Sequence, residues 1–125
     1  MEPIELIRAS NRTAPPGGQT PGMVREQAFA AEGIWAGVVL TQPGMVSDWH
    51  HHGDHDTHFY VTTGRARLEF GHEGRDEVNA GPGDFVHVPP RTVHRESNPS
   101  GETSVLVLFR AGKGDIVVNV AGPDA

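Results

Sequence analysis

The chain has 125 residues, no cysteine and a formal net charge of −6. This length predicts one domain, the missing cysteine excludes disulfide scaffolds and thiolate metal sites, and the acidic balance argues against a nucleic-acid or membrane partner. No apolar run approaches the roughly 20 residues of a membrane-spanning helix. The acidic N-terminus also lacks the apolar segment of a signal peptide, so we expect a cytoplasmic protein.

The N-terminal part is expected to be an arm followed by a loop. Residues 4–8 alternate weakly between apolar and charged side chains, and residues 13–22 contain three prolines and three glycines. Neither a helix nor a central strand tolerates that mixture. The best helix candidate, residues 24–32, is short and has no convincing capping residue.

Short strands dominate the rest of the chain. They are rich in β-branched and aromatic residues and cover 34–40, 59–63, 65–70, 85–88, 104–109 and 116–118. Turn signals recur at intervals of about 8–12 residues, a spacing typical of an antiparallel sandwich or barrel. We expect the aromatic residues Trp35, Phe70, Phe85 and Phe109 in the core. The fold class is therefore predicted to be all-β, with little or no helix.

Histidine is concentrated in one segment. Five of the eight histidines lie between positions 50 and 58. Residues i and i+2 of a strand share a face, so His50 and His52 should point the same way, close enough to share a metal ion, whereas His51 points the opposite way. This pattern predicts a metal site.

Two spaced motifs resemble those of the cupin superfamily. The first runs from Gly44 through five residues to His50 and His52, then through four residues to Thr57 and six more to Gly64. The sequence is similar here to the first cupin motif, except that the family usually has glutamate where Thr57 stands.

The second cupin motif is also matched in order and spacing. Gly83 is followed after five residues by Pro89, then by Arg91, His94 and Asn98 at the family's intervals. Arg91 replaces the glycine of the family pattern. We expect it in an ordinary turn geometry, either solvated or projecting as a carboxylate clamp at the barrel mouth.

The resemblance to small single-domain cupins implies a jelly-roll, or double-stranded β-helix, barrel. It implies one cupin domain over residues 1–125, with an N-terminal strand or arm and a Pro/Gly loop over 1–23 and the barrel over 24–120. It also implies a homodimer, in which the N-terminal strand often joins the partner's sheet, and one divalent transition metal per chain held by His50, His52 and His94. Imidazole ligands suit iron, zinc, nickel, manganese and copper, so they do not name the metal.

The fourth ligand position is left open: it holds either no protein ligand or one of several candidates. Thr57 should face the barrel interior but offers only a hydroxyl. Asp56 carries a carboxylate but needs a bulge to turn inward, and His58 should face outward; His55 is the remaining alternative. Glu96 lies two residues beyond His94 on the same expected face, where its carboxylate would reach the metal, bind a ligating imidazole or remain at the rim.

The resemblance and the ligand set together predict a function. A centre of three histidines without a carboxylate favours anionic ligands, with Arg91 and Glu96 as candidate substrate contacts, and leaves positions open for substrate or dioxygen. Such centres look like those of cupin dioxygenases, so we expect a dioxygenase-like enzyme acting on a small organic acid or dicarbonyl. The alternatives are a metal-dependent isomerase or lyase, and a non-catalytic barrel that binds or senses a small molecule.

Overall fold

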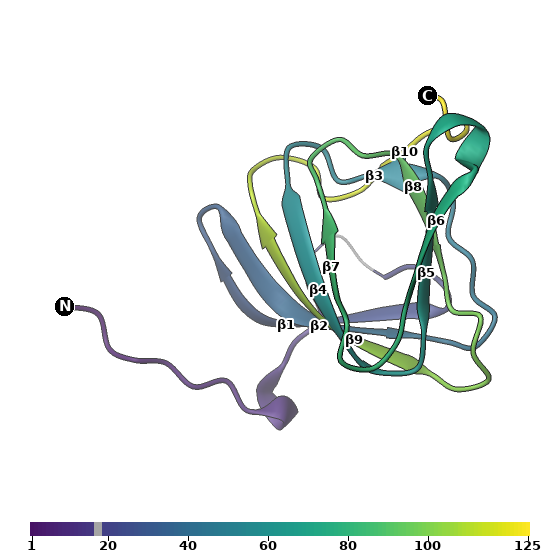
Figure 1. The fold of residues 1–125 in the computed structure, drawn as a ribbon. Coiled ribbons are helices and arrows are strands. Elements are labelled where there is room, and N and C mark those ends of the chain that lie inside the picture. Colours follow the sequence, from purple (N-terminus) through teal and green to yellow (C-terminus); the bar gives the residue numbers. More distant parts are fainter. Residues whose placement is uncertain (17–18) are drawn as a thin grey trace.

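A computed structural model describes residues 1–16 and 19–125. Residues 17 and 18, in the middle of the predicted Pro/Gly loop, lie outside the described residues. The first eight residues extend away from the body of the molecule (Figure 1) and are followed by a single 3-10 turn, η1 (Ala9–Asn11). A second 3-10 turn, η2 (His72–Gly74), lies between the strands β5 (Ala66–Phe70) and β6 (Asp76–Ala80). No helix within the described ranges is long and apolar enough to cross a membrane.

The first sheet has five antiparallel strands in the order β1-β2-β9-β4-β7. Their bounds are Met23–Ala31 for β1, Ile34–Thr41 for β2, Ser104–Ala111 for β9, Asp56–Thr63 for β4 and Phe85–Val88 for β7. The strands β2, β9 and β4 form its continuous centre, and β1 and β7 are its two edges.

The second sheet also has five strands, in the order β10-β3-β8-β5-β6. Their bounds are Val118–Asn119 for β10, His50–His51 for β3, His94–Ser97 for β8, Ala66–Phe70 for β5 and Asp76–Ala80 for β6. The two sheets face each other as the walls of a jelly-roll barrel (Figure 1), and the predicted all-β fold is confirmed.

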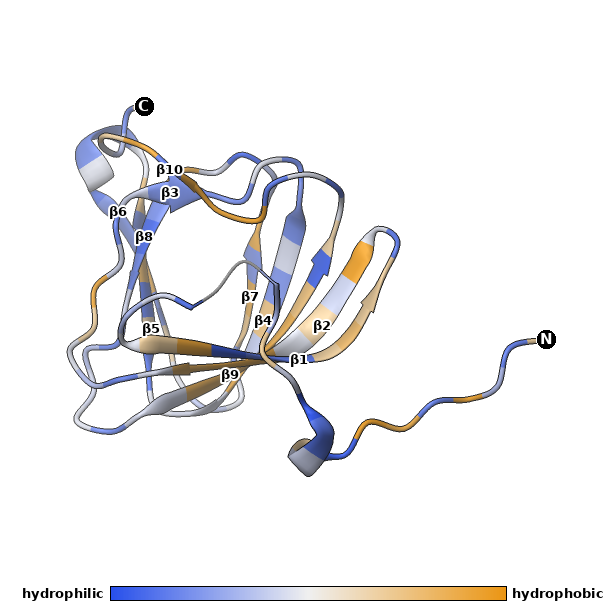
Figure 2. Cartoon of the chain, turned by 180° about the vertical axis from the view of Figure 1, so that it is seen from behind, coloured by the Kyte–Doolittle hydropathy of each residue, from blue (hydrophilic) through white to orange (hydrophobic). Residues whose placement is uncertain are grey.

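The core lies between the sheets because the strands alternate strictly. In β4 the buried residues are Thr57, Phe59 and Val61, and in β9 Leu106 and Leu108 point inward. Figure 2 shows that the hydrophobic residues are concentrated along β2 and β9, whereas β3 and β8 are hydrophilic. One wall of the barrel is therefore mainly apolar, and the other carries the polar groups of the site.

Three expectations from the sequence need correction. Residues 24–32 form no helix, because nearly all of them belong to the edge strand β1, which pairs with β2 along its length. Phe85 and Phe109 are not in the core and are 80% and 53% exposed. Each lies next to inward-facing residues on its strand, so alternation places both rings on the outer face. Trp35 is buried as predicted.

The turn glycine that ends the first motif has a steric reason. Gly64 has a φ of +77°, and a Cβ atom there would lie 2.8 Å from the Cα of Ser104. Any side chain would therefore both strain the backbone and collide with β9. This close approach keeps the end of β4 against β9, on the wall that faces the histidines.

Candidate metal centre

Three buried histidines meet inside the barrel. His50 begins β3, His52 follows directly after it, and His94 begins β8 opposite His50 in the strand register. Their ring centroids are 4.5 to 5.0 Å apart. Two strands of one sheet thus bring together residues that are 42 to 44 positions apart in the sequence.

Backbone carbonyls orient all three rings in the same sense. Nδ1 of His50 lies 2.8 Å from the carbonyl oxygen of Asp48. Nδ1 of His52 lies 2.7 Å from that of Ile116, and Nδ1 of His94 lies 2.8 Å from that of Thr92. A carbonyl oxygen only accepts hydrogen bonds, so each Nδ1 carries the proton and donates it. Each neutral ring then has its lone pair on Nε2, which is the arrangement of metal-ligating histidines.

Glu96 completes the cluster. It lies on β8 two residues after His94, and its Oε1 is 3.0 Å from Nε2 of His94 and 3.8 Å from Nε2 of both His50 and His52. The four possible ligand atoms lie within 4.8 Å of one another. Three imidazole lone pairs directed at a carboxylate repel it unless a cation lies between them, so the donor set fits a divalent metal.

The charges of the cluster are strongly coupled. Burial alone would raise the pKa of Glu96, but hydrogen bonds from His50, His52 and His94, which form when their Nε2 atoms carry protons instead of binding an ion, hold it well below its usual value. Burial lowers the pKa of His52 to about 4, despite Glu96. Burial also lowers the pKa of His50, but the hydrogen bond to Glu96 and the charge of Glu96 outweigh burial, so the pKa of His50 is raised.

These shifts predict how metal affinity depends on pH. Binding needs a neutral Nε2 on His50, whose raised pKa lets protons compete already above its ordinary value of about 6.5. His52 stays neutral down to about pH 4, so above that pH protons do not compete with the metal for its Nε2. We expect metal affinity to fall about tenfold per unit as the pH drops through the pKa of His50. Titration with a competing chelator at several pH values measures this, and an affinity that is flat between neutral pH and pH 5 contradicts it.

None of the other candidates for the fourth ligand brings a carboxylate or an imidazole into the cluster. Thr57 is buried and faces the histidines, but it offers only a neutral hydroxyl. This hydroxyl has no hydrogen-bond partner among the described residues. Asp56 faces outward, since β4 runs without a bulge from Asp56 to Val61, and His58 lies beside it on the outer surface. His55 is buried but its Nε2 contacts the carbonyl of Gly114. Of the carboxylates proposed from the sequence, only Glu96 lies with the histidines.

Arg91 does not line the cavity. Its side chain is 74% exposed and pairs with Asp54, with Nε 2.8 Å from Oδ1. Its φ is +59°, so the expectation of an ordinary turn geometry is wrong: the residue adopts the left-handed conformation that the glycine of the cupin motif would adopt without strain.

This strain predicts an order of stabilities at position 91. Arg91→Gly loses an exposed ion pair worth about 0–1 kcal/mol but relieves a strain of about 1–2 kcal/mol. Arg91→Ala loses the same ion pair and keeps the strain. We expect the glycine variant to be more stable than the alanine variant by about 1 kcal/mol in urea unfolding. Equal stabilities of the two variants would show that the left-handed geometry costs nothing here.

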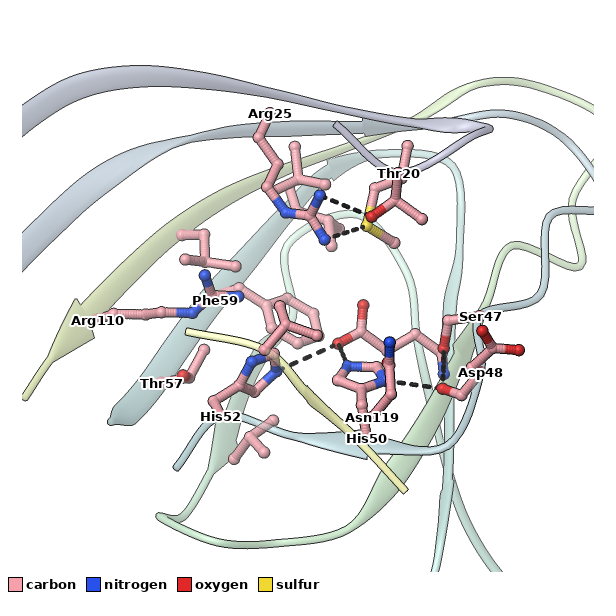
Figure 3. Close-up of a pocket in the computed structure, with 17 residues that line it drawn as sticks. Thr20, Arg25, Ser47, Asp48, His50, His52, Thr57, Phe59, Arg110 and Asn119 are labelled. Carbon is pink, nitrogen blue, oxygen red and sulfur yellow. Dashed lines mark hydrogen bonds and ion pairs between the residues drawn. The ribbon is translucent and has the colours of Figure 1, made fainter. Parts of the chain in front are cut away.

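Two arginines that were not predicted as site residues from the sequence face the cluster. Arg25 comes from β1 and Arg110 from β9, and both line a cavity of about 110 Å³ together with His50, His52 and Glu96 (Figure 3). Arg110 is only 5% exposed, and its Nε has no partner within the part of the chain that the structure describes. The sequence signal was present, because Arg110 continues the inward series of Leu106 and Leu108.

Burial lowers the pKa of Arg110 to about 10. The negative charge of Glu96 raises this pKa, and the positive charge of Arg25 lowers it further. Burial likewise lowers the pKa of Arg25. Both groups remain cationic at neutral pH. Arg25 donates a hydrogen bond of 3.0 Å to Thr20 Oγ1, so the end of the Pro/Gly loop helps to position it.

A second, larger cavity adjoins the inner one. This outer cavity has a volume of about 450 Å³ and shares Arg25, Arg110, Thr20 and Val117 with the inner one. Trp35 and Gln19 line its far side. The two arginines therefore line both cavities.

Comparisons with known proteins place this geometry in a family. A search of curated proteins gave no match. Among solved structures, KdgF from Halomonas sp. is similar with 23% identity and a TM-score of 0.70, covering 89% of this chain and 96% of that one. A conserved Klebsiella pneumoniae protein with a double-stranded β-helix domain has 18% identity and a TM-score of 0.72 over 95% and 99% of the two chains.

A third similar structure belongs to a larger protein. Oxalate decarboxylase from Bacillus subtilis has 22% identity and a TM-score of 0.68, with 82% of this chain matching 28% of that one. The family description "Cupin domain" matches residues 37–110, a range that includes all three histidines and Glu96. The chain belongs to the cupin family, as its two motifs predicted.

Proposed function

We propose that this cupin is a mononuclear metal-dependent enzyme that acts on a small organic acid. The ion would be held by His50, His52, His94 and Glu96. The acid would lie between that ion and Arg25 and Arg110. The observation that carries the proposal is that the buried Arg110 and the half-buried Arg25 face the histidine–glutamate cluster across one cavity.

The charge balance of the cavity favours an anionic ligand. A divalent ion with one carboxylate ligand keeps a net positive charge, and the two arginines add to it. A buried guanidinium without a partner is costly, and a carboxylate offers it paired, charge-assisted hydrogen bonds. The unpartnered Nε of Arg110 is a donor that a bound carboxylate would satisfy. Oxalate decarboxylase, a structurally similar protein, acts by its name on an acid of this class.

The chain's own residues would prepare such a substrate for reaction. Arg25 and Arg110 would orient its carboxylate, and the apolar side chains of Val39, Phe59 and Leu106, which line the same cavity, would exclude water and strengthen these contacts. The free hydroxyl of Thr57 is placed to donate a hydrogen bond to a substrate oxygen. A divalent ion bound in the cluster supplies Lewis-acid polarisation of a substrate oxygen.

The reaction class follows from the fourth ligand. The expectation of dioxygenase-like chemistry rested on three histidines without a carboxylate, and that premise does not hold if Glu96 is the fourth ligand, as proposed here. We therefore favour a redox-neutral reaction, an isomerisation or a lyase or decarboxylase cleavage. Apoprotein loaded separately with iron, manganese, nickel, zinc or copper should convert members of a panel of 2-oxo acids, hydroxy acids and dicarboxylates without consuming oxygen. Oxygen consumption coupled to turnover would favour a dioxygenase, and tight binding without turnover a sensing barrel.

We further propose that the chain forms a homodimer through its N-terminal arm. Residues 1–8 make no strand of their own, and Ile4 and Leu6 are exposed, although apolar side chains of this kind are normally covered. Light scattering of the full chain and of a variant lacking residues 1–8 tests this. A dimer that dissociates on deletion supports the arm, and a monomeric full chain contradicts it.

A further inference from the structure

A second group of metal-ligating side chains lies on the outer face of the first sheet. Asp56 and His58 project from the same side of β4, and His87 projects from the neighbouring edge strand β7. The strand register places His58 directly opposite His87. One ligand atom from each of the three residues lies within 4.8 Å of the others. We call Asp56, His58 and His87 the outer site.

The side chains of the outer site already lie in contact with one another. The rings of His58 and His87 stack with centroids 4.4 Å apart and an interplanar angle of 11°. Nε2 of His87 lies 2.6 Å from Oδ1 of Asp56. Two imidazoles and one carboxylate form a donor set that zinc, nickel and copper prefer over calcium or magnesium. The side chains of His87 and Asp56 are 49% and 42% exposed, so water has access to the remaining coordination positions.

The outer site is separate from the cluster inside the barrel. Thr57 lies between Asp56 and His58 in the sequence, and its buried side chain points to the opposite face of β4. The backbone of the sheet therefore separates the two groups of ligands. On the outer face, Phe109 of β9 is paired in register with His58 and borders the site on the side away from β7.

Strand pairing explains why these ligands would be held rigidly. β4 is a central strand, hydrogen-bonded to β9 on one side and β7 on the other. Directly opposite side chains on antiparallel strands have Cβ atoms about 4.5–5.5 Å apart, a separation from which two imidazoles reach one ion. Since β7 is a four-residue edge strand, Phe85–Val88, an ion bridging it to β4 would tie this edge to the sheet.

We propose that Asp56, His58 and His87 form a second transition-metal site, on the surface of the barrel, so that the chain binds two ions rather than one. The outer site is the weaker, because it offers three protein ligands in water where the inner one offers four in a largely buried cavity. An ion bound there stabilises the folded state, since the ligands converge only when β4 and β7 are paired.

Calorimetric titration of metal-free full-length protein with Ni²⁺ near neutral pH tests the stoichiometry. We expect a tight first step and a weaker second step in the wild type, and only the first step in His58→Gln/His87→Gln. His72→Gln is the matched control, because His72 is also exposed and pairs with a carboxylate, that of Asp124, but has no second imidazole beside it. A wild type that binds one equivalent, as an ordinary Asp56–His87 ion pair implies, overturns the proposal. A double variant that still binds two equivalents also overturns it.

A second measurement locates the ion in the unmodified protein. During addition of the second equivalent of Zn²⁺, the imidazole nitrogen resonances of His58 and His87 should shift together while those of His72 stay unchanged. The thermal midpoint should rise with that equivalent in the wild type and not in His58→Gln/His87→Gln. Shifts confined to other histidines would place the second ion elsewhere and overturn the assignment.

Discussion

Replacing His50 and His52 together with alanine is expected to abolish tight metal binding. Structural zinc sites with four ligands bind with about 10–16 kcal/mol, or roughly 3 kcal/mol per ligand, so losing two ligands should weaken binding by roughly four orders of magnitude. The fold should persist, because both side chains face the inner cavity, so truncating them removes little of the packing between the two sheets. Metal content after chelator competition and the circular dichroism of the β-sheet measure the two quantities.

The outer site must be removed before this result is interpreted. The measurement is therefore made in a His87→Gln background, where the weak equivalent expected on the surface is absent. His72→Ala serves as the control and should leave metal content unchanged. Tight binding of one equivalent by His50→Ala/His52→Ala in that background would show that the inner cluster is not the metal site.

Replacing Arg110 with methionine is expected to weaken binding of a small dicarboxylate while leaving the metal in place. Removing one partner of a buried charge pair costs about 2–5 kcal/mol, which corresponds to roughly 30- to 5,000-fold in affinity. Methionine is of similar length and removes a buried charge, so the free energy of unfolding should not fall. Oxalate binding to the metal-loaded protein, measured by calorimetry, is a direct probe.

A matched variant separates a local from a general charge effect. Arg67→Met removes a cation from β5 whose guanidinium pairs with Asn79 and Glu77 on the outer surface, so oxalate affinity should remain at the wild-type value. If Arg110→Met binds oxalate as tightly as Arg67→Met does, the arginine pair is not the carboxylate-binding group, and the proposed substrate class loses its support.

Strand periodicity explains why so much of the fold was predictable. Because side chains alternate along a strand, Thr57 could be placed inside the barrel and His58 outside it from the sequence alone, and both placements are found in the structure. The same rule, applied consistently, would have placed Phe85 and Phe109 outside as well. Their assignment to the core followed their hydrophobicity instead, which is a weaker guide on strands with one face toward solvent.

The parts of the site that were not predicted from the sequence depend on which strands pair with one another. Alternation placed Glu96 on the face of His94, but only the antiparallel pairing of β3 with β8 brings its carboxylate to all three imidazoles. Arg25 and Arg110 are 85 positions apart in the sequence and lie together because β2 pairs with both β1 and β9. The turn geometry of Arg91 could not be predicted, because it depends on a positive φ angle that no side-chain pattern indicates.

A crystal structure of the protein with one equivalent of Zn²⁺, recorded at the zinc absorption edge, tests the central claim most directly. The account predicts one strong anomalous peak inside the barrel, about 2.0–2.2 Å from Nε2 of His50, His52 and His94 and from a carboxylate oxygen of Glu96, with Arg25 and Arg110 across the cavity. A first-equivalent peak on the outer face, or one inside the barrel without Glu96 among its ligands, would contradict it.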